Sequence, residues 1–216
     1  MEDPRSKNVT PAANCVTEYL RKYCAEVSNI VNRVSSERLE MVFSILRDKL
    51  QNGNRIYCAG NGGSAAIAAH LCCDWTKSTR MPGRPSLMVH SLMENTSLLT
   101  ALANDIGYEE AVSEQLELYA KPGDALVLLS CSGNSPNMVR AAQTARRLEI
   151  DTISFTGFDG GRLLTLSDVN IHIPIENYGM VEDCHQMLMH VLTQYLYQWR
   201  VKVSESVSVS GGQPVC

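Results

Sequence analysis

The sequence lacks any apolar run long enough to cross a lipid bilayer, and its first fifteen residues lack the apolar core of a secretory signal. These absences predict a cytoplasmic protein with no membrane partner. The chain also lacks a basic stripe that could neutralise a phosphate backbone, because Lys and Arg are scattered and the formal net charge is −4. Nucleic acid is therefore not expected as a partner.

Cysteine pairs of the CxxC type are absent too, and several of the eight cysteines lie inside apolar runs. In a cytosolic protein this usage indicates buried or incidental thiols and not a disulfide framework. The chain has 216 residues, of which 44% are hydrophobic. This suffices for one domain with a hydrophobic core. We expect that domain at residues 11–202, after a flexible N-terminus (1–10) and before a flexible tail (203–216).

Two helical patterns open the chain, at about 11–32 and at 36–50, where apolar residues recur three and four positions apart. A pair of amphipathic helices ahead of a compact sheet predicts assembly into a homo-oligomer. From residue 55 onward, short β-rich runs alternate with helical patterns, as in a parallel sheet covered by helices on both faces. The predicted fold class is therefore α/β. The run at 124–130 is almost wholly apolar, as expected for a central strand.

Two Gly/Ser-rich loops follow β-rich runs: GNGGS at 60–64 and SCSGNS at 130–135. Ligands gather at such loops in an open α/β sheet, because the first N–H groups of the next helix have no partner within that helix. The second loop adds three hydroxyls and Asn134 at a helix start, which predicts a phosphate cradle. Neither loop reads GxGxxG or carries the Lys-Ser/Thr of a P-loop, so a monophosphate fits better than a triphosphate with magnesium. For the first loop alone, an ordinary strand-to-helix turn is the alternative.

Histidines and carboxylates recur on two predicted helices. His70 and Asp74 lie four apart on one face, as a metal pair, an acid/base pair or a surface hydrogen bond would. The last helix begins with Glu182, His185 and His190, and its two histidines point about 140° apart, so only one of them easily shares a site with Glu182. The default interpretation of His190 is a core or interface residue. Imidazoles and carboxylates beside a phosphate cradle nevertheless favour zinc or a similar divalent ion.

Five motifs in fixed order carry a family resemblance: GNGGSAAIAAH (60–70), NDIGYE (104–109), SCSGNSPN (130–137), TGFDGG (156–161) and EDCHQMLMH (182–190). Together they resemble the sugar isomerase (SIS) domain, and within that family the phosphoheptose isomerases most. The resemblance runs from the second helical pattern to the end of the last one, almost the whole chain. Several ordered motifs make it more specific than either loop alone.

The resemblance implies a three-layer fold with a five-stranded parallel sheet, N-terminal helices that serve oligomerisation, and a homotetramer with active sites at subunit interfaces. It implies an aldose–ketose isomerase that converts sedoheptulose 7-phosphate, through an enediol, to a D-glycero-D-manno-heptose 7-phosphate type of product. One zinc or other divalent ion per active site would be held by His70, Asp74, Glu182 and His190. The implied substrate-binding residues are Asn61, Gly62, Gly63, Ser64, Asn104, Asp105, Ser130, Cys131, Ser132, Asn134 and Ser135.

Three positions depart from the family pattern. Asp74 stands where the family has the Glu that moves the proton, Glu182 where it has Gln, and Cys131 where it more often has Thr. An Asp is one methylene shorter, and misplacing a base by about 1 Å lowers the rate on the order of 10²-fold. Either Asp74 or Glu182 is then the base, with His190 as an acid in ring opening, or the site no longer turns over. Two different functions would also fit the motifs: a non-catalytic SIS module that binds a sugar phosphate or a protein partner, and an isomerase of another phosphorylated sugar.

Overall fold

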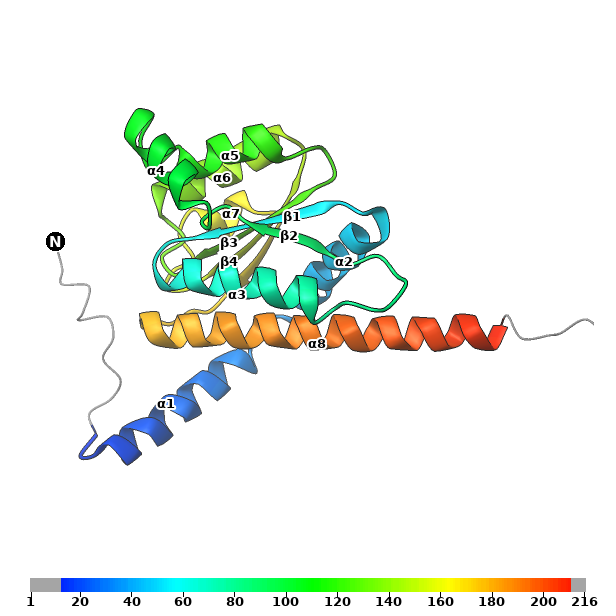
Figure 1. Ribbon diagram of the computed structural model, residues 1–216. Helices are drawn as coiled ribbons and strands as arrows, with labels where there is room; N and C mark the ends of the chain where they lie inside the picture. The colour runs from blue at the N-terminus through cyan, green and yellow to red at the C-terminus, as the bar shows by residue number, and fades with distance from the viewer. Residues whose placement is uncertain (1–12, 211–216) are drawn as a thin grey trace, which may run out of the picture.

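The computed structural model describes residues 13–210, with side chains up to residue 205. The predicted flexible N-terminus (1–10) and the end of the predicted tail (211–216) lie outside that part of the chain. A five-stranded sheet with the order β2-β1-β3-β4-β5 forms the middle layer (Figure 1). Every neighbouring pair of strands is parallel, which confirms the predicted α/β class. The strands are β1 (Arg55–Gly60), β2 (Met88–Ser91), β3 (Ala125–Ser130), β4 (Asp151–Thr156) and β5 (Val169–His172).

Helices form the layers on either side of the sheet (Figure 1). One side holds α2 (Ser36–Asn52), α3 (Gly63–Lys77) and α8 (Tyr178–Ser210), with α1 (Val16–Val31) outside α8. The other side holds α4 (Thr96–Asp105), α5 (Ala111–Tyr119), α6 (Pro136–Arg147) and α7 (Leu163–Leu166). Within residues 13–210, no helix combines the length and the apolar character that crossing a lipid bilayer requires.

Strand β3 shows why the sheet has two cores. All of its residues are buried, and successive side chains point to opposite faces. Leu126 and Leu128 pack in the cluster that includes residues of α5 and α6, whereas Val127 and Leu129 pack in the cluster that includes residues of α2, α3 and α8. A strand buried on both faces needs apolar residues at every position, so the continuous apolar run correctly predicted a central strand.

Helix α8 is longer than the sequence indicated. It continues to Ser210, past the predicted domain end at residue 202, so the first part of the predicted tail is helical. Arg200 is buried and donates hydrogen bonds from Nη1 to the carbonyl oxygen of Thr79 and from Nη2 to that of Pro85, both at 2.6 Å. These bonds join the far half of α8 to the segment between α3 and β2.

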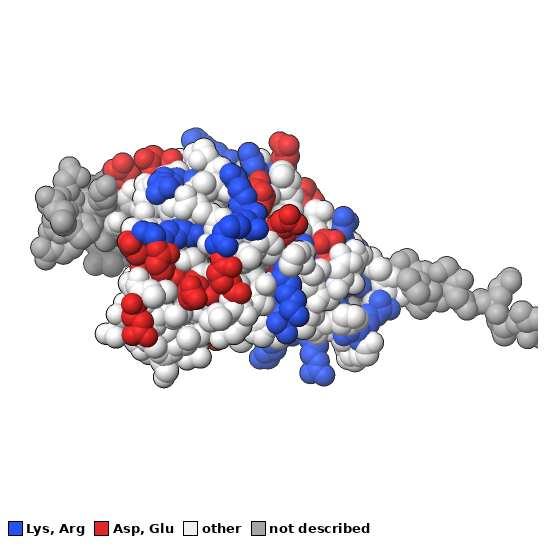
Figure 2. Space-filling model, turned by 90° about the horizontal axis from the view of Figure 1, so that it is seen from above, with Lys and Arg blue, Asp and Glu red and all other residues white. Residues whose placement is uncertain are grey.

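Figure 2 shows acidic and basic side chains interspersed on the face seen from above, where α4, α5 and α6 lie in Figure 1. Ion pairs account for part of this mixture. The guanidinium of Arg140 contacts the carboxylates of Glu109 and Glu110, and that of Arg147 contacts Glu117. The pairs join α6 to α5 and to the turn before it.

Candidate functional site

The two Gly/Ser-rich loops lie side by side at the carboxyl ends of β1 and β3. These strands are neighbours, and Gly60 at the end of β1 pairs with Leu129 of β3. The loops border a cavity of about 150 Å³, which we call the serine-loop cavity. Its lining includes most of the predicted substrate-binding residues, together with Glu182 from α8. The lining residues are Asn61, Ser64, Leu129, Ser130, Cys131, Ser132, Ser135, Tyr178 and Glu182.

The 130–135 loop presents uncharged donors to this cavity. Ser135 precedes α6 but makes no side-chain capping bond, and its Oγ lies 3.5 Å from Ser130 Oγ. Pro136 occupies the first position of α6, where the N–H that a proline lacks would have no partner within the helix. The remaining N–H groups and the positive end of the helix dipole favour an anion there. Hydroxyls and helix start together can hold a phosphate group.

The TGFDGG segment supports the back of this loop. Gly133 has φ +61°, and a Cβ on it would overlap the carbonyl oxygen of Gly160. The N–H of Leu163 donates to the Gly133 oxygen at 3.0 Å, and that of Arg162 donates to Asn134 Oδ1 at 3.0 Å. The Asn134 side chain therefore bonds to this turn and does not line the cavity, so its contribution is to fix the loop.

Glycines bring α8 close to the start of α3. Gly62, the residue before α3, has φ +56° and ψ −124°, which suits glycine because it has no Cβ. A Cβ on Gly63 would overlap the carboxylate of Glu182. Neither glycine lines the serine-loop cavity. The missing side chain of Gly63 leaves the room that the Glu182 carboxylate occupies at the helix start, whereas a Cβ on Gly62 would meet open space.

Asn61 is held by two side chains that the sequence did not single out as site residues. Its amide exchanges two hydrogen bonds with the amide of Asn137, both at 2.9 Å, and its Oδ1 accepts a third from the Tyr108 hydroxyl at 2.7 Å. Asn104 and Asp105 were predicted near the sugar, but they bond to each other on the surface and do not line the cavity. The NDIGYE segment instead reaches the site through Tyr108.

A second cluster of polar side chains lies between α3 and α8. Nε2 of His70 and Nε2 of His190 lie 3.6 Å and 3.5 Å from Oδ2 of Asp74. One potential ligand atom from each residue lies within 4.8 Å of the others. In a tetrahedral zinc site with bonds of about 2.0–2.1 Å, neighbouring ligand atoms are about 3.3 Å apart. The three side chains therefore fit a divalent ion with little rearrangement.

Glu182 is not part of this group of three, although the resemblance implied that it would be the fourth ligand. It precedes His190 by eight residues, about 12 Å along the helix axis, and lies level with the start of α3. The amide beside the imidazoles belongs to Gln186, whose Nε2 lies 2.9 Å from Nδ1 of His70 and 3.1 Å from Nε2 of His190. Sequence reasoning missed Gln186. The available signal was its position four residues before His190, on the same helix face.

Burial changes the protonation of two groups in the serine-loop cavity. It raises the pKa of the Glu182 carboxyl, and the charge of Asp183 raises it further. Burial also raises the pKa of the Cys131 thiol to about 11, so this side chain is a neutral thiol at neutral pH. A carboxyl group with a raised pKa exchanges protons closer to neutral pH than an ordinary Glu does.

His185 takes no part in either cluster. It is fully buried, packs against Phe155, and its Nε2 lies 3.3 Å from the carbonyl oxygen of Thr156. Burial lowers its pKa to about 4, so it is neutral at physiological pH. His185 therefore contributes to the packing of α8 on β4.

Comparison with known proteins agrees with these features. A family model described as the SIS domain matches residues 22–157. A phosphoheptose isomerase from Chlorobaculum parvum is 37% identical over 174 residues, which cover 80% of this chain and 83% of the relative. One from Aliarcobacter butzleri is 35% identical over 181 residues, covering 82% and 94%. The structure of a phosphoheptose isomerase from Neisseria gonorrhoeae superimposes with a TM-score of 0.77 at 28% identity, covering 84% of this chain and 98% of that one.

Proposed function

The chain belongs to the SIS-domain family as an aldose–ketose isomerase of the phosphoheptose isomerase type, and we propose that it converts sedoheptulose 7-phosphate to a D-glycero-D-manno-heptose 7-phosphate. The observation that carries this proposal is that α3 and α8 connect two clusters of polar side chains, the serine-loop cavity and the group of His70, Asp74 and His190. The serine hydroxyls at the start of α6 suit the phosphate, and Glu182 of α8 borders the same cavity beside the start of α3. The imidazole–carboxylate group lies about two turns further along α3 and α8. An open-chain sugar phosphate extends from one cluster toward the other.

The metal is proposed to be zinc or a similar divalent ion, held by His70, Asp74 and His190. When bound, such an ion would act as a Lewis acid toward the sugar oxygens that reach it. The Nε2 atom of His190 faces Asp74, so the ligand role competes with the expected role of His190 as an acid in ring opening. Gln186 would hold the His70 ring in place through Nδ1, which leaves Nε2 of His70 for the ion.

Proton transfer is assigned here to Glu182. Asp74 lies between two imidazoles, whereas the Glu182 carboxylate borders the serine-loop cavity and has a raised pKa. Glu182 takes a proton from the hydroxyl-bearing carbon beside the carbonyl, and the carbonyl oxygen is protonated, which gives an enediol. The other enediol oxygen then loses its proton to become the new carbonyl, while Glu182, after exchanging its proton with solvent, protonates the former carbonyl carbon. Both carbons stay in the substrate, so no other reactant is needed. A non-catalytic SIS module would leave the group of three side chains without a role.

We further propose a cytoplasmic homotetramer with active sites at subunit interfaces. A cavity of about 610 Å³ between α1 and α8 has Gln186 and His190 in its lining, so the metal cluster opens toward α1. Val16 and Leu20 of α1 are 86% and 57% exposed, an apolar surface that a second copy would bury. The Tyr23 hydroxyl, also on α1, donates to Asp183 Oδ2 at 2.7 Å.

The direct test is to incubate the purified protein with a panel of ketose phosphates, sedoheptulose 7-phosphate first, and to follow aldose formation by NMR. We expect conversion of the seven-carbon substrate, and loss of conversion after dialysis against a chelator with recovery on adding zinc. Conversion of a six-carbon ketose phosphate alone would refute the proposed substrate. Absence of any conversion by metal-loaded protein would favour a binding module.

A further inference from the structure

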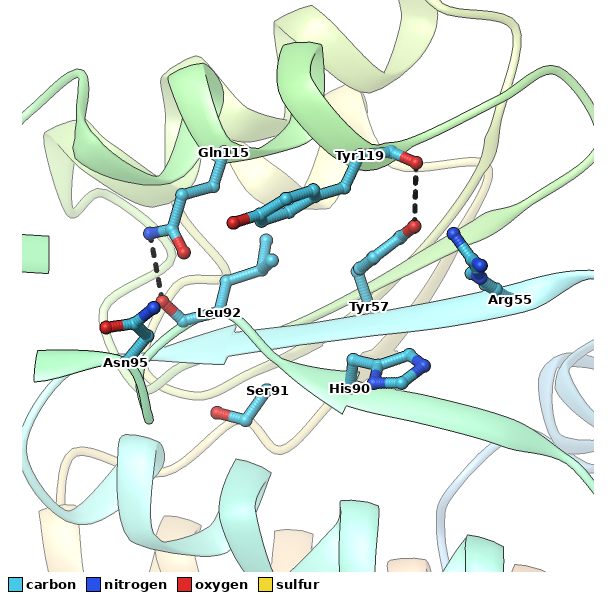
Figure 3. A pocket seen from close by; sticks show the side chains of 8 residues that line it. All are labelled: Arg55, Tyr57, His90, Ser91, Leu92, Asn95, Gln115 and Tyr119. Carbon is cyan, nitrogen blue, oxygen red and sulfur yellow. Dashed lines mark hydrogen bonds between the residues drawn. The ribbon is translucent and has the colours of Figure 1, made fainter. Parts of the chain in front are cut away.

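A second cavity, of about 340 Å³, lies between α5 and the strands β1 and β2 (Figure 3). It shares no lining residue with the serine-loop cavity. Its volume falls in the lower part of the range for small-molecule sites. The side chains that matter here are Arg55 and Tyr57 from β1, Leu92 from the segment after β2, and Gln115 and Tyr119 from α5. This cavity is called the α5 cavity below.

Gln115 presents a hydrogen-bond acceptor to the α5 cavity. The residue is 1% exposed, and its Nε2 donates to the carbonyl oxygens of Leu92 at 3.0 Å and Ala111 at 2.9 Å. These two bonds fix the orientation of the amide, because a flipped amide would place its oxygen against two carbonyl oxygens. Oε1 then points into the space between α5 and the strands (Figure 3), where no described residue donates to it. A ligand with an N–H or O–H group would satisfy this oxygen.

Arg55 presents a cation at the other end of the α5 cavity (Figure 3). Its guanidinium forms no ion pair with any carboxylate in the described part of the chain. The carboxylate of Asp124 instead accepts from the backbone N–H groups of Arg55 at 2.8 Å and Lys121 at 3.0 Å. A hydrogen bond with the side chain of Tyr57 raises the pKa of Arg55. The other N–H groups of this exposed guanidinium can bind a phosphate or carboxylate group of a ligand.

Between these two ends, aromatic and aliphatic side chains supply flat apolar surface. The Tyr57 hydroxyl donates to the backbone oxygen of Tyr119 at 2.9 Å, which fixes the Tyr57 ring at the cavity wall. The ring of Tyr119 and the side chain of Leu92 lie on the same side of the strands as Gln115 (Figure 3). A planar ring can stack on Tyr119 in this space.

We propose that the α5 cavity binds a nucleoside monophosphate. The base stacks on Tyr119 and donates an N–H to Gln115 Oε1, and the phosphate pairs with Arg55. Of the common small anions, this class combines a flat ring, a ring-borne donor and a phosphate in one molecule. The proposal is independent of the isomerase function, because neither Arg55 nor Gln115 lines the serine-loop cavity.

The test is isothermal titration of the full-length protein with adenosine 5′-monophosphate, repeated in the variants Arg55→Ala and Tyr119→Ala. We expect saturable binding to the wild type, and affinity about tenfold or more weaker in each variant, since each loses a charge-assisted hydrogen bond or a stacking surface. Arg80→Ala is the matched control: it removes the same charge from an exposed arginine outside the α5 cavity and should bind like the wild type.

Three results would overturn the proposal in whole or in part. One is no saturable binding to the wild type. Another is an unchanged affinity in Arg55→Ala and Tyr119→Ala, which would place any binding elsewhere, such as the serine loop. Ribose 5-phosphate that binds as tightly as the nucleotide, with no effect of Tyr119→Ala, would refute the role of the ring. Turnover of Arg55→Ala without nucleotide should equal that of the wild type, so a failed isomerase assay has no bearing on this result.

Discussion

Asp74 and Glu182, which the sequence left as equivalent candidates for the base, have different surroundings. Asp74 lies between the imidazoles of His70 and His190, whereas Glu182 lies at the start of α3 beside the serine-loop cavity. A helical wheel gives the direction in which each side chain points around its own helix axis. It does not give the offset along that axis at which a neighbouring helix packs. The convergence of His70, Asp74 and His190 depends on how α3 and α8 pack, so their contacts could only be read from the structure.

Replacing Gln186 tests its contact with Nδ1 of His70. In Gln186→Leu we expect the dissociation constant for zinc to rise about 10- to 100-fold, because a side chain that orients metal ligands has effects of this size. Competition with a chromophoric chelator measures it. Gln194→Leu makes the same change at an exposed position two turns further along α8 and should leave zinc affinity unchanged. Equal zinc affinities in Gln186→Leu and the wild type would contradict a role for Gln186 at the metal site.

At the scale of the elements, periodicity and apolar runs predicted most of the fold. Strand β3 and helix α2 follow directly from their patterns, and α2 begins after Ser35, whose side chain accepts from the Arg38 N–H, and ends before Gly53 at φ +70°. The length of α8 was underestimated because valines alternate with polar residues in its last turns, a pattern without helical periodicity. Helix α4 has apolar residues, yet none of them is buried, which a periodic pattern cannot reveal.

The packing of the serine loop on the TGFDGG turn predicts a specific effect of Gly133→Ala. The added Cβ meets the Gly160 oxygen and pushes the loop away from the TGFDGG turn, so we expect KM for the sugar phosphate to rise on the order of tenfold or more. Gly53→Ala is the control, since Gly53 has a similar φ of +70° but open space around it. Gly53→Ala should lose about 1–2 kcal/mol of unfolding free energy, Gly133→Ala should lose more because of the overlap with Gly160, and only Gly133→Ala should change KM. If KM rose equally in Gly133→Ala and Gly53→Ala, backbone strain and not the contact with Gly160 would explain the change.

At the scale of the whole molecule, the sheet separates two buried clusters and α8 closes one of them. His185 belongs to the closing helix and sits against β4 with Nε2 near the Thr156 oxygen, and its Nδ1 has no hydrogen-bond partner among the described residues. A protonated imidazole would be unfavourable in that position. The fold therefore depends on His185 staying neutral.

For this reason, the free energy of unfolding should decrease as the pH is lowered. The pKa of His185 is about 4 in the fold against 6.5 as its ordinary value, so the unfolded chain binds the proton more readily. The contribution of neutral His185 to the free energy of unfolding is complete above pH 6.5 and is lost as the pH falls toward 4. Between pH 7.5 and 5 it amounts to about 2 kcal/mol. Urea denaturation at the two pH values measures it, and His185→Gln should remove that part of the difference; an unchanged difference would exclude His185 as its source.

The central claim is that Glu182 moves a proton through an enediol in a sugar phosphate held by the serine loop. The most direct measurement is NMR of the product formed from sedoheptulose 7-phosphate in D₂O by metal-loaded protein. We predict deuterium at C2 of the aldose, and turnover lowered about 10²- to 10⁴-fold in Glu182→Gln, as for loss of a general base, with zinc content unchanged. Aldose formed without deuterium, or undiminished turnover and labelling in Glu182→Gln, would contradict the account.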